Sequence, residues 1–374
     1  MIVQGISVVV PTKGRTGYVK ETLFSLAAAK EHCSESSQII VVDDSSGSEA
    51  RQVKGICETS GAEYFYHRGG VSDKRNFGIC KARFPIVLFV DSDCKVDAHI
   101  FEEHLRCYSN DSIGGCLGLT EFTGKKTMVS KIVTEKIPFI PPHQFAKHLE
   151  YAPWGPCTNI SFRTDVLDQV KGFASFLPPK EGSEDVDLGY RVRQLGCKIR
   201  CNPNAIVFHA REALGGWSGL IARAFRWGRA EAHLLSQHHE NSYLDILKPT
   251  LLFGILLIVS LCIGFTTHTF SLIFMPFLWF LTVILFQGFL ALAKELQRAS
   301  CKEATCSFIS VVVDLVFEFG TMLECVRRRE LRLLPLKFVY EEGQLHNRWH
   351  RGMIKTWSFV IAFVTIFVIY TILL

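Results

Sequence analysis

Short apolar runs alternate with longer amphipathic stretches along the first part of the chain. Strand-like runs lie at residues 6–10, 38–42, 63–67 and 86–90, and helix-like stretches lie at residues 18–29 and 73–83. Apolar runs separated by helices of this length are typical of strands that are buried on both faces of a sheet. The pattern therefore predicts an α/β fold, with a mainly parallel sheet that carries helices on both faces.

The pattern is less regular farther along, where we expect a helix over residues 186–195 and a strand over residues 205–209. An amphipathic, arginine-rich stretch follows at residues 220–235. Charged and apolar residues stay mixed up to this point, as they do in globular domains. We therefore expect one soluble domain over residues 1–243.

The next segment is much more apolar. From Pro249 to Ala293 the chain has no Asp, Glu, Lys or Arg. This length is sufficient for two helices of about 20 residues that each cross a membrane. We therefore expect membrane spans at residues 249–266 and 270–293, and a third span at the uncharged residues 356–374.

Residues 307–326 are also apolar, but they include Asp314, Glu318 and Glu324. Ionisable side chains are costly in lipid, so we expect this helix to lie at the interface or to pack inside a bundle. Residues 244–374 together form the predicted membrane region. Lys and Arg beside the spans predict a multi-pass membrane protein whose soluble domain faces the cytoplasm.

Net charge and cysteine spacing limit the partners and the location of the chain. The net charge is +5, and the clearest basic cluster, Arg327–Arg329 with Arg332, lies between membrane-type segments. This placement favours membrane lipids with anionic headgroups over nucleic acid. The 13 cysteines show no C-x-x-C spacing, and the chain starts without a basic leader. We therefore expect reduced thiols, no structural zinc motif and no secretory signal.

Polar side chains follow three of the predicted strands. They are Pro11-Thr12-Lys13 after the first strand, Asp43-Asp44 after the second, and Asp91-Ser92-Asp93 after the strand at residues 86–90. Ligands of open α/β sheets bind at the carboxyl ends of the strands. Two carboxylates one residue apart, Asp91 and Asp93, can share a divalent cation or its water shell. A pair that caps the loop is the structural alternative.

Six short motifs between Ser7 and Leu188 carry a family resemblance. They are Ser7–Thr12 (SVVVPT), Val41–Ser45 (VVDDS), Lys74–Gly78 (KRNFG), Phe89–Asp93 (FVDSD), Asn159–Arg163 (NISFR) and Ser183–Leu188 (SEDVDL). In this order they resemble the inverting glycosyltransferases of family 2. The resemblance implies the GT-A nucleotide-binding fold, a nucleotide-sugar donor and a divalent metal, Mn²⁺ or Mg²⁺.

The resemblance also implies donor-binding residues. Pro11 and Thr12 lie at the first strand end, and the carboxylate of Asp43 or Asp44 meets the base and ribose. For Asp44 the alternative is an Asx turn. Lys74 and Arg75 resemble the basic residues near the diphosphate, where positive charge helps the leaving group. As helix-surface residues, these two are alternatively exposed to solvent.

Metal and catalytic roles follow from the same resemblance. Asp93 is the expected direct metal ligand, Asp91 serves the ribose or the ion, and His209 matches a third metal ligand of some relatives. A structural role is the alternative for His209. Asp185 matches the base that takes the proton of the acceptor hydroxyl, with Glu184 as the second candidate. A structural alternative for Asp185 is the N-terminal cap of the following helix.

Residues 223–229 read R-A-F-R-W-G-R and resemble the Q-x-x-R-W element of processive synthases, such as cellulose and hyaluronan synthases. In those enzymes tryptophan packs by the acceptor sugar and arginine by the diphosphate, which points to Trp227 and Arg226. Arg223 replaces the glutamine, which departs from the pattern. A basic amphipathic helix on the membrane surface is the alternative.

We therefore expect an inverting glycosyltransferase that moves a sugar from a UDP- or GDP-sugar to a membrane-bound, lipid-linked or polysaccharide acceptor. Three alternatives stay open: a processive polysaccharide synthase, a sugar-nucleotide nucleotidyltransferase and a non-catalytic membrane scaffold. The sequence Pro11–Arg15 supplies only part of the glycine-rich, basic signature that a nucleotidyltransferase needs after its first strand.

Overall fold

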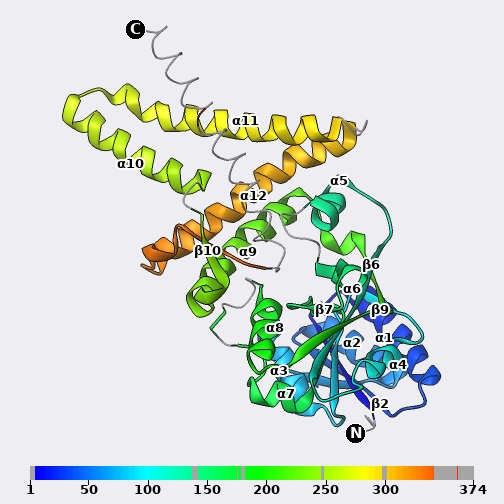
Figure 1. Cartoon of the computed structure of the whole chain (residues 1–374). Coiled ribbons are helices and arrows are strands. Elements are labelled where there is room, and N and C mark those ends of the chain that lie inside the picture. The colour runs from blue at the N-terminus through cyan, green and yellow to red at the C-terminus, as the bar shows by residue number, and fades with distance from the viewer. Residues whose placement is uncertain are drawn as a thin grey trace. The chain divides into compact units, whose positions relative to one another are not determined.

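The structure is a computed structural model that describes residues 5–136, 142–174, 176–177, 182–245, 248–296, 301–340 and 360. The chain divides into two compact units (Figure 1). The first comprises residues 1–126 and 140–214, and the second comprises residues 127–139 and 215–374. The domain limits expected at residues 1–243 and 244–374 stay a prediction about where a soluble domain meets a membrane.

Parallel strands form one half of the sheet in the first unit. They are β3 (Glu63–Tyr66), β2 (Ser37–Asp43), β1 (Ile6–Thr12) and β4 (Ile86–Phe89), in this spatial order. All three pairings among them are parallel. The carboxyl ends of β1, β2 and β4 therefore lie at one edge of the sheet.

The other half of the sheet is mixed. Its strands are β8 (Ile160–Arg163), β6 (Ile113–Thr123), β9 (Lys198–Ala210) and β5 (Cys94–Val96), with β7 (Tyr151–Ala152) beside β9. β8 runs antiparallel to β4 and β6, and β5 and β7 run antiparallel to β9, whereas β6 and β9 are parallel. The expected α/β class is confirmed, and the parallel arrangement holds for the first four strands.

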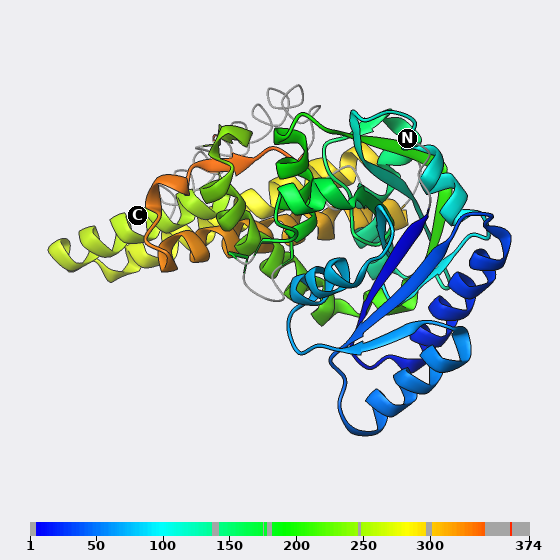
Figure 2. The same cartoon turned by 90° about the horizontal axis from the view of Figure 1, so that it is seen from below.

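Helices cover both faces of the parallel strands (Figure 2). Val8 and Val10 of β1 face a core shared with α1 (Thr16–His32) and α2 (Gly47–Ser60). Val9 faces the opposite side, where α3 (Val71–Lys81) packs so closely that a Cβ at Gly78 would clash with it. Alternate residues of a continuous apolar strand are thus buried on both faces, as its pattern predicts. The remaining helices of this unit are α4 (Ile100–Arg106), α6 (Phe145–His148), α7 (Thr164–Gln169) and α8 (Glu184–Gln194).

A buried polar chain joins α4 to three strands. Nδ2 of Asn159 donates to the carbonyl oxygens of Leu119 and Ala205, so its Oδ1 is left to accept from Nε2 of His104 at 2.9 Å. Nδ1 of His104 then accepts from the Ser161 hydroxyl at 2.8 Å. Each buried group in this chain has a partner when the His104 ring is neutral. Burial lowers the pKa of His104 to about 4.

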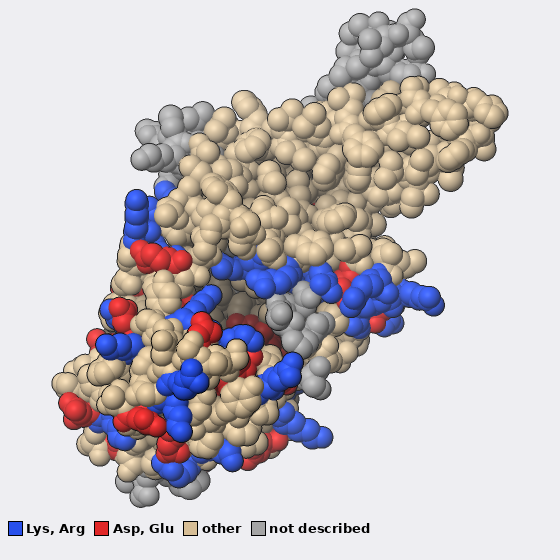
Figure 3. Space-filling view, turned by 180° about the vertical axis from the view of Figure 1, so that it is seen from behind, with Lys and Arg blue, Asp and Glu red and all other residues tan. Residues whose placement is uncertain are grey.

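The second unit is helical. Its elements are α5 (Met128–Lys131), α9 (Trp217–Gln237), α10 (Pro249–Thr267), α11 (Phe274–Leu296) and α12 (Cys301–Arg327), with a small antiparallel pair of β10 (Ser242–Leu244) and β11 (Leu336–Phe338). Within the described residues, three segments are long and apolar enough to cross a membrane: Pro249–Thr267, Phe270–Leu290 and Thr305–Arg327. Figure 3 shows a broad surface without Lys, Arg, Asp or Glu, which matches the uncharged stretch that forms α10 and most of α11. The span expected at residues 356–374 lies outside the described residues, apart from Val360.

Helix α12 packs along α9 through backbone contacts and buried ion pairs. Gly228 and Gly320 face the backbone of the partner helix, with no room for a Cβ. Glu324 is fully buried and pairs with Nε of Arg229 at 2.8 Å. Glu231 accepts hydrogen bonds from the Thr321 hydroxyl and from the backbone N–H of β11. Carboxylates along this helix pair therefore find partners inside the unit, as buried charges must.

The neutral state of His104 predicts a pH-dependent stability. The unfolded state takes up the proton below the usual pKa of 6.5, whereas the folded state takes it up only near 4. Stability should therefore fall as the pH decreases through this window, by up to roughly 3 kcal/mol from this one group. Urea unfolding followed by fluorescence measures it, with His104→Gln as the non-titrating control. An identical pH dependence in both proteins would contradict the prediction.

Candidate active site

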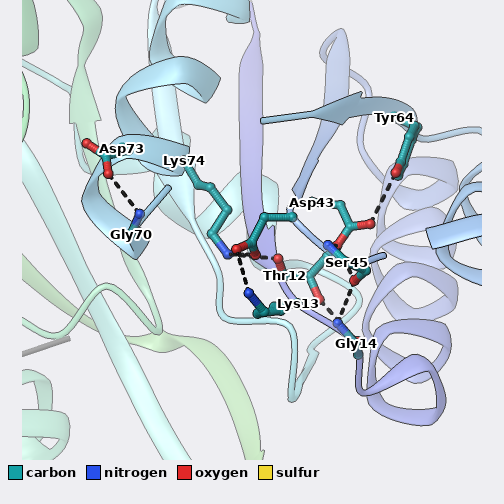
Figure 4. Close-up of polar contacts among 10 residues, drawn as sticks. Thr12, Lys13, Gly14, Asp43, Ser45, Tyr64, Gly70, Asp73 and Lys74 are labelled. Carbon is teal, nitrogen blue, oxygen red and sulfur yellow. Dashed lines mark hydrogen bonds and ion pairs between the residues drawn. The ribbon is translucent and has the colours of Figure 1, made fainter. Parts of the chain in front are cut away.

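The carboxyl end of β2 places two neighbouring carboxylates in different environments. Figure 4 shows the contacts of the first of them, Asp43, with Ser45 and Tyr64. Asp43 is fully buried and accepts hydrogen bonds from the backbone N–H and hydroxyl of Ser45, and from the hydroxyl of Tyr64 at 3.1 Å. The bond from the Ser45 N–H forms an Asx turn, which belongs to Asp43 and not to Asp44. The Ser45 hydroxyl also accepts from the N–H of Gly14, which ties the loop after β1 to the loop after β2.

Asp44 is paired with two lysines. Its Oδ1 lies 2.7 Å from Nζ of Lys74, and its Oδ2 lies 3.0 Å from Nζ of Lys13. Burial opposes ionisation, but the bonds from these lysines lower the pKa of Asp44 below its usual range. Nζ of Lys74 also donates to the carbonyl oxygen of Thr12 at 2.8 Å. Lys74 is 6% exposed and thus lies inside the site, not on a solvated helix face.

Arg75 connects two acidic residues that are far apart in the sequence. Its guanidinium donates to Oε1 of Glu184 at 2.7 Å and to Oδ1 of Asp91 at 3.0 Å. The side chain is 4% exposed and lies over the ring of Phe173, which Asn76 fixes through two backbone hydrogen bonds. Nε of Arg75 is buried without a partner among the described residues. A buried donor of this kind is available to a ligand.

Asp185 lies beside this ion pair, at the start of α8. The backbone enters the helix through Gly182 and Ser183, both with positive φ, 89° and 68°. Ser183 therefore holds a left-handed conformation that is costly for a residue with a Cβ, a strain that is common at functional turns. Burial and the neighbouring charge of Glu184 raise the pKa of Asp185 to about 7, although Arg75 opposes the shift. Its Oδ1 also accepts from the N–H of Val186 in the first turn of α8, whereas the N-cap position of the helix is Ser183.

Asp93 forms a second cluster, separate from Arg75. Nη1 of Arg15 lies 2.8 Å from its Oδ2, and Nε2 of His209 lies 3.5 Å from its Oδ1. Nδ1 of His209 faces the carbonyl oxygen of Ala210 at 2.9 Å and must donate to it. Nε2 is therefore the ring nitrogen that faces Asp93, and it is the nitrogen that a metal ion at this cluster would use.

The donor set of this cluster fits a divalent cation. One ligand atom each from Asp93, Cys94 and His209 lies within 4.8 Å of the others. Asp91 is not a member of this group, because its Oδ1 accepts from Arg75 and its Oδ2 accepts from the Thr158 hydroxyl at 3.0 Å. Of the expected metal ligands, the structure therefore brings Asp93 and His209 together and gives Asp91 other partners.

The remaining residues that the sequence predicts for the site belong to β1 and α9. Pro11 and Thr12 end β1, next to Lys74. Arg226 and Trp227 belong to α9 of the second unit, where Arg226 is exposed and the guanidinium of Arg223 lies 5.9 Å from the Trp227 ring.

Four residues of the site were not predicted, namely Arg15, Cys94, Thr158 and Phe173. Two of them had a sequence signal, since Cys94 directly follows the acidic triplet and Thr158 directly precedes the N-I-S-F-R motif.

Comparison with known proteins identifies a family whose model matches this chain. The family model described as "Glycosyltransferase like family 2" matches residues 4–230, more than half of the chain. No curated protein sequence matches significantly.

Two solved structures are similar in fold at low identity. The mannosyltransferase PcManGT from Pyrobaculum calidifontis, in complex with GDP-Man and Mn²⁺, is 15% identical with a TM-score of 0.45 and covers 63% of this chain and 64% of its own. GalNAc-T7 with UDP, GalNAc and Mn²⁺ is 15% identical with a TM-score of 0.44 and covers 63% and 51%. The chain spans less than two thirds of the length of each.

The two carboxylates of the triplet should differ in metal binding. Asp93→Asn removes a charged ligand beside His209, so the affinity for Mn²⁺ should fall at least about ten-fold. Asp91→Asn is the matched control, with the same chemical change two residues away, and should weaken binding less because Arg75 and Thr158 hold that carboxylate. Titration of free Mn²⁺ by electron paramagnetic resonance measures both affinities. An equal loss in the two variants would show that the site is shared between them.

Proposed function

Because the chain belongs to the glycosyltransferase-like family 2, we propose that it transfers one sugar, with inversion, from a UDP- or GDP-sugar to a membrane-bound or lipid-linked acceptor. One observation carries the proposal. A buried cation pair, a cluster that fits a metal and a carboxyl group with a pKa near neutrality lie in the same unit, at the carboxyl ends of its strands. Ligands of α/β sheets bind at this edge.

The donor end of the site has to stabilise a leaving nucleoside diphosphate. A divalent cation held by Asp93 and His209 would neutralise part of its charge. Lys74 and Arg75 add two buried cations, and the free Nε–H of Arg75 offers a further hydrogen bond. Their carboxylate partners fix both side chains in place before the donor binds, so little reorganisation is needed during the reaction.

The acceptor end of the site needs a base. In a single displacement the acceptor hydroxyl attacks the anomeric carbon from the face opposite the leaving group and gives up its proton. Asp185 is assigned this role because its pKa of about 7 matches a group that exchanges protons near neutral pH. Glu184 is tied to Arg75 at 2.7 Å and is therefore assigned to holding the site together.

Membrane anchoring fits the proposed acceptor. Helices α10 and α11 carry exposed apolar side chains, including Ile258, Phe265, Phe274 and Phe289, that suit lipid better than water. A catalytic unit tethered to a membrane meets a lipid-linked acceptor at a high effective concentration. We propose a multi-pass protein with the catalytic unit on the cytoplasmic side.

A donor panel tests the reaction class. The full chain in detergent, incubated with UDP- and GDP-sugars and Mn²⁺, should release nucleoside diphosphate from one of them. Release of pyrophosphate from a sugar phosphate and a nucleoside triphosphate would identify a nucleotidyltransferase instead. A polymer that grows from one donor would replace single transfer with processive synthesis.

Asp185→Asn should separate binding from chemistry. The amide cannot take a proton, so transfer should fall by about 10²–10⁴-fold while donor affinity stays near the wild-type value. Turnover and a calorimetric donor titration measure the two effects. Asp168→Asn, the same change at an exposed position of α7, is the control and should leave both unchanged. Full turnover in the Asp185 variant would disprove the base assignment.

Glu184→Gln should shift the pH profile. The base acts in its ionised form, so transfer should decline below pH 7, about ten-fold per unit. Removal of the neighbouring negative charge lowers the pKa of Asp185, which moves this acidic limb to lower pH. Initial rates between pH 5 and about 8 measure the limb. A limb at the same pH in both proteins would contradict the proposed coupling.

A further inference from the structure

We infer that the Cys94 thiol is a third metal ligand, so that the site takes a transition-metal ion bound to sulfur in preference to Mg²⁺. The inference rests on the proposed function, because a metal at Asp93 and His209 is part of that proposal. It adds to the metal ligands a residue outside the acidic triplet and the histidine, and it specifies the class of metal ion that binds.

The strand register places the three side chains together. Cys94 of β5 is paired directly with His209 of β9, and Asp93 immediately precedes β5. Sγ of Cys94 lies 3.8 Å from Oδ1 of Asp93, and Nε2 of His209 lies 3.5 Å from the same oxygen. Tetrahedral ligands at about 2.0–2.3 Å from a metal lie roughly 3.3–3.8 Å from each other. The three groups therefore need only small movements to share one ion.

A cavity beside the cluster gives access to it. It has a volume of about 310 Å³, and its lining includes Asp93, Cys94, Tyr18, Glu21 and Thr22. The Thr22 hydroxyl is fully buried and has no hydrogen-bond partner among the described residues. A cavity lined by carboxylates and an unpaired hydroxyl has room and partners for water that fills the remaining metal positions.

The ligand types select the ion. Mg²⁺ binds oxygen and keeps most of its water, whereas a thiolate and an imidazole favour Zn²⁺, Co²⁺ and similar ions. Binding breaks the S–H bond, forms a sulfur–metal bond and releases the proton to the buffer. Arg15 holds Asp93 without the ion, and because its side chain is 54% exposed it can move into solvent as the metal enters.

Co²⁺ is the probe, because a thiolate ligand produces a sulfur-to-cobalt charge-transfer band in the near ultraviolet. The full chain should show this band on titration with Co²⁺. Cys94→Ser should still bind Co²⁺ through Asp93 and His209, with an affinity that is lower by up to about ten-fold. The charge-transfer band should be absent from this variant. The ratio of the affinity for Co²⁺ to the affinity for Mg²⁺ should be smaller in this variant than in the wild type. Cys57→Ser removes an equally buried thiol from α2 and should keep both the band and the affinity.

Three results would overturn the inference, and they differ in what they leave of the proposed function. Co²⁺ bound to the wild type without the band would exclude the thiol and leave the metal site of the proposed function intact. No Co²⁺ binding to the wild type at all would remove the metal site itself, and the proposed function with it. A band that persists in Cys94→Ser would assign the sulfur to another residue.

Discussion

The buried guanidinium of Arg75, held between Asp91 and Glu184, is the interaction on which the rest of the site depends. It joins the end of β4 to the start of α8, and Arg75 is 109 residues from Glu184 in the sequence. A charge that is 4% exposed is tolerable only when its partners are present, so the fold of the first unit and the positions of these carboxylates are coupled. The guanidinium carbon also lies 5.5 Å from the centre of the Phe173 ring, so an aromatic side chain borders this charge.

The same arrangement divides the acidic residues by role. Asp91 and Glu184 are occupied by Arg75, and Asp44 is occupied by two lysines. Asp185 has no such direct cation partner among the residues that the structure describes, and burial and the charge of Glu184 raise its pKa to about 7. Asp93 lies with His209 and Cys94, where a metal ion fits. Carboxylates close together in one unit thus differ in chemistry because their nearest partners differ.

The second unit contains charged residues in a largely apolar environment. Its two packed helices approach through Gly228 and Gly320, and this close contact brings the carboxylates of Glu231 and Glu324 within reach of donors on neighbouring elements. Helices α10 and α11, in contrast, have almost no charged residues over their length and expose aliphatic and aromatic side chains. Composition alone separates these two kinds of apolar helix, because the packed one carries carboxylates along its length, whereas the charged residues of α11 lie only in its last turn.

The sequence by itself determined the four parallel strands, the helices α1 and α3 and the apolar segments, because these depend on local periodicity and composition. It did not predict β5, β6 and β7, or the antiparallel half of the sheet, since pairing between distant strands has no local signal and β6 is interrupted by glycines. The motifs named most of the candidate residues. Only the tertiary structure decided that Asp43 makes the Asx turn, that Lys74 and Arg75 are buried, and that Asp91 and Asp93 have different partners. These are properties of side-chain contacts between segments far apart in the chain, and the spacing of residues along a sequence does not contain them.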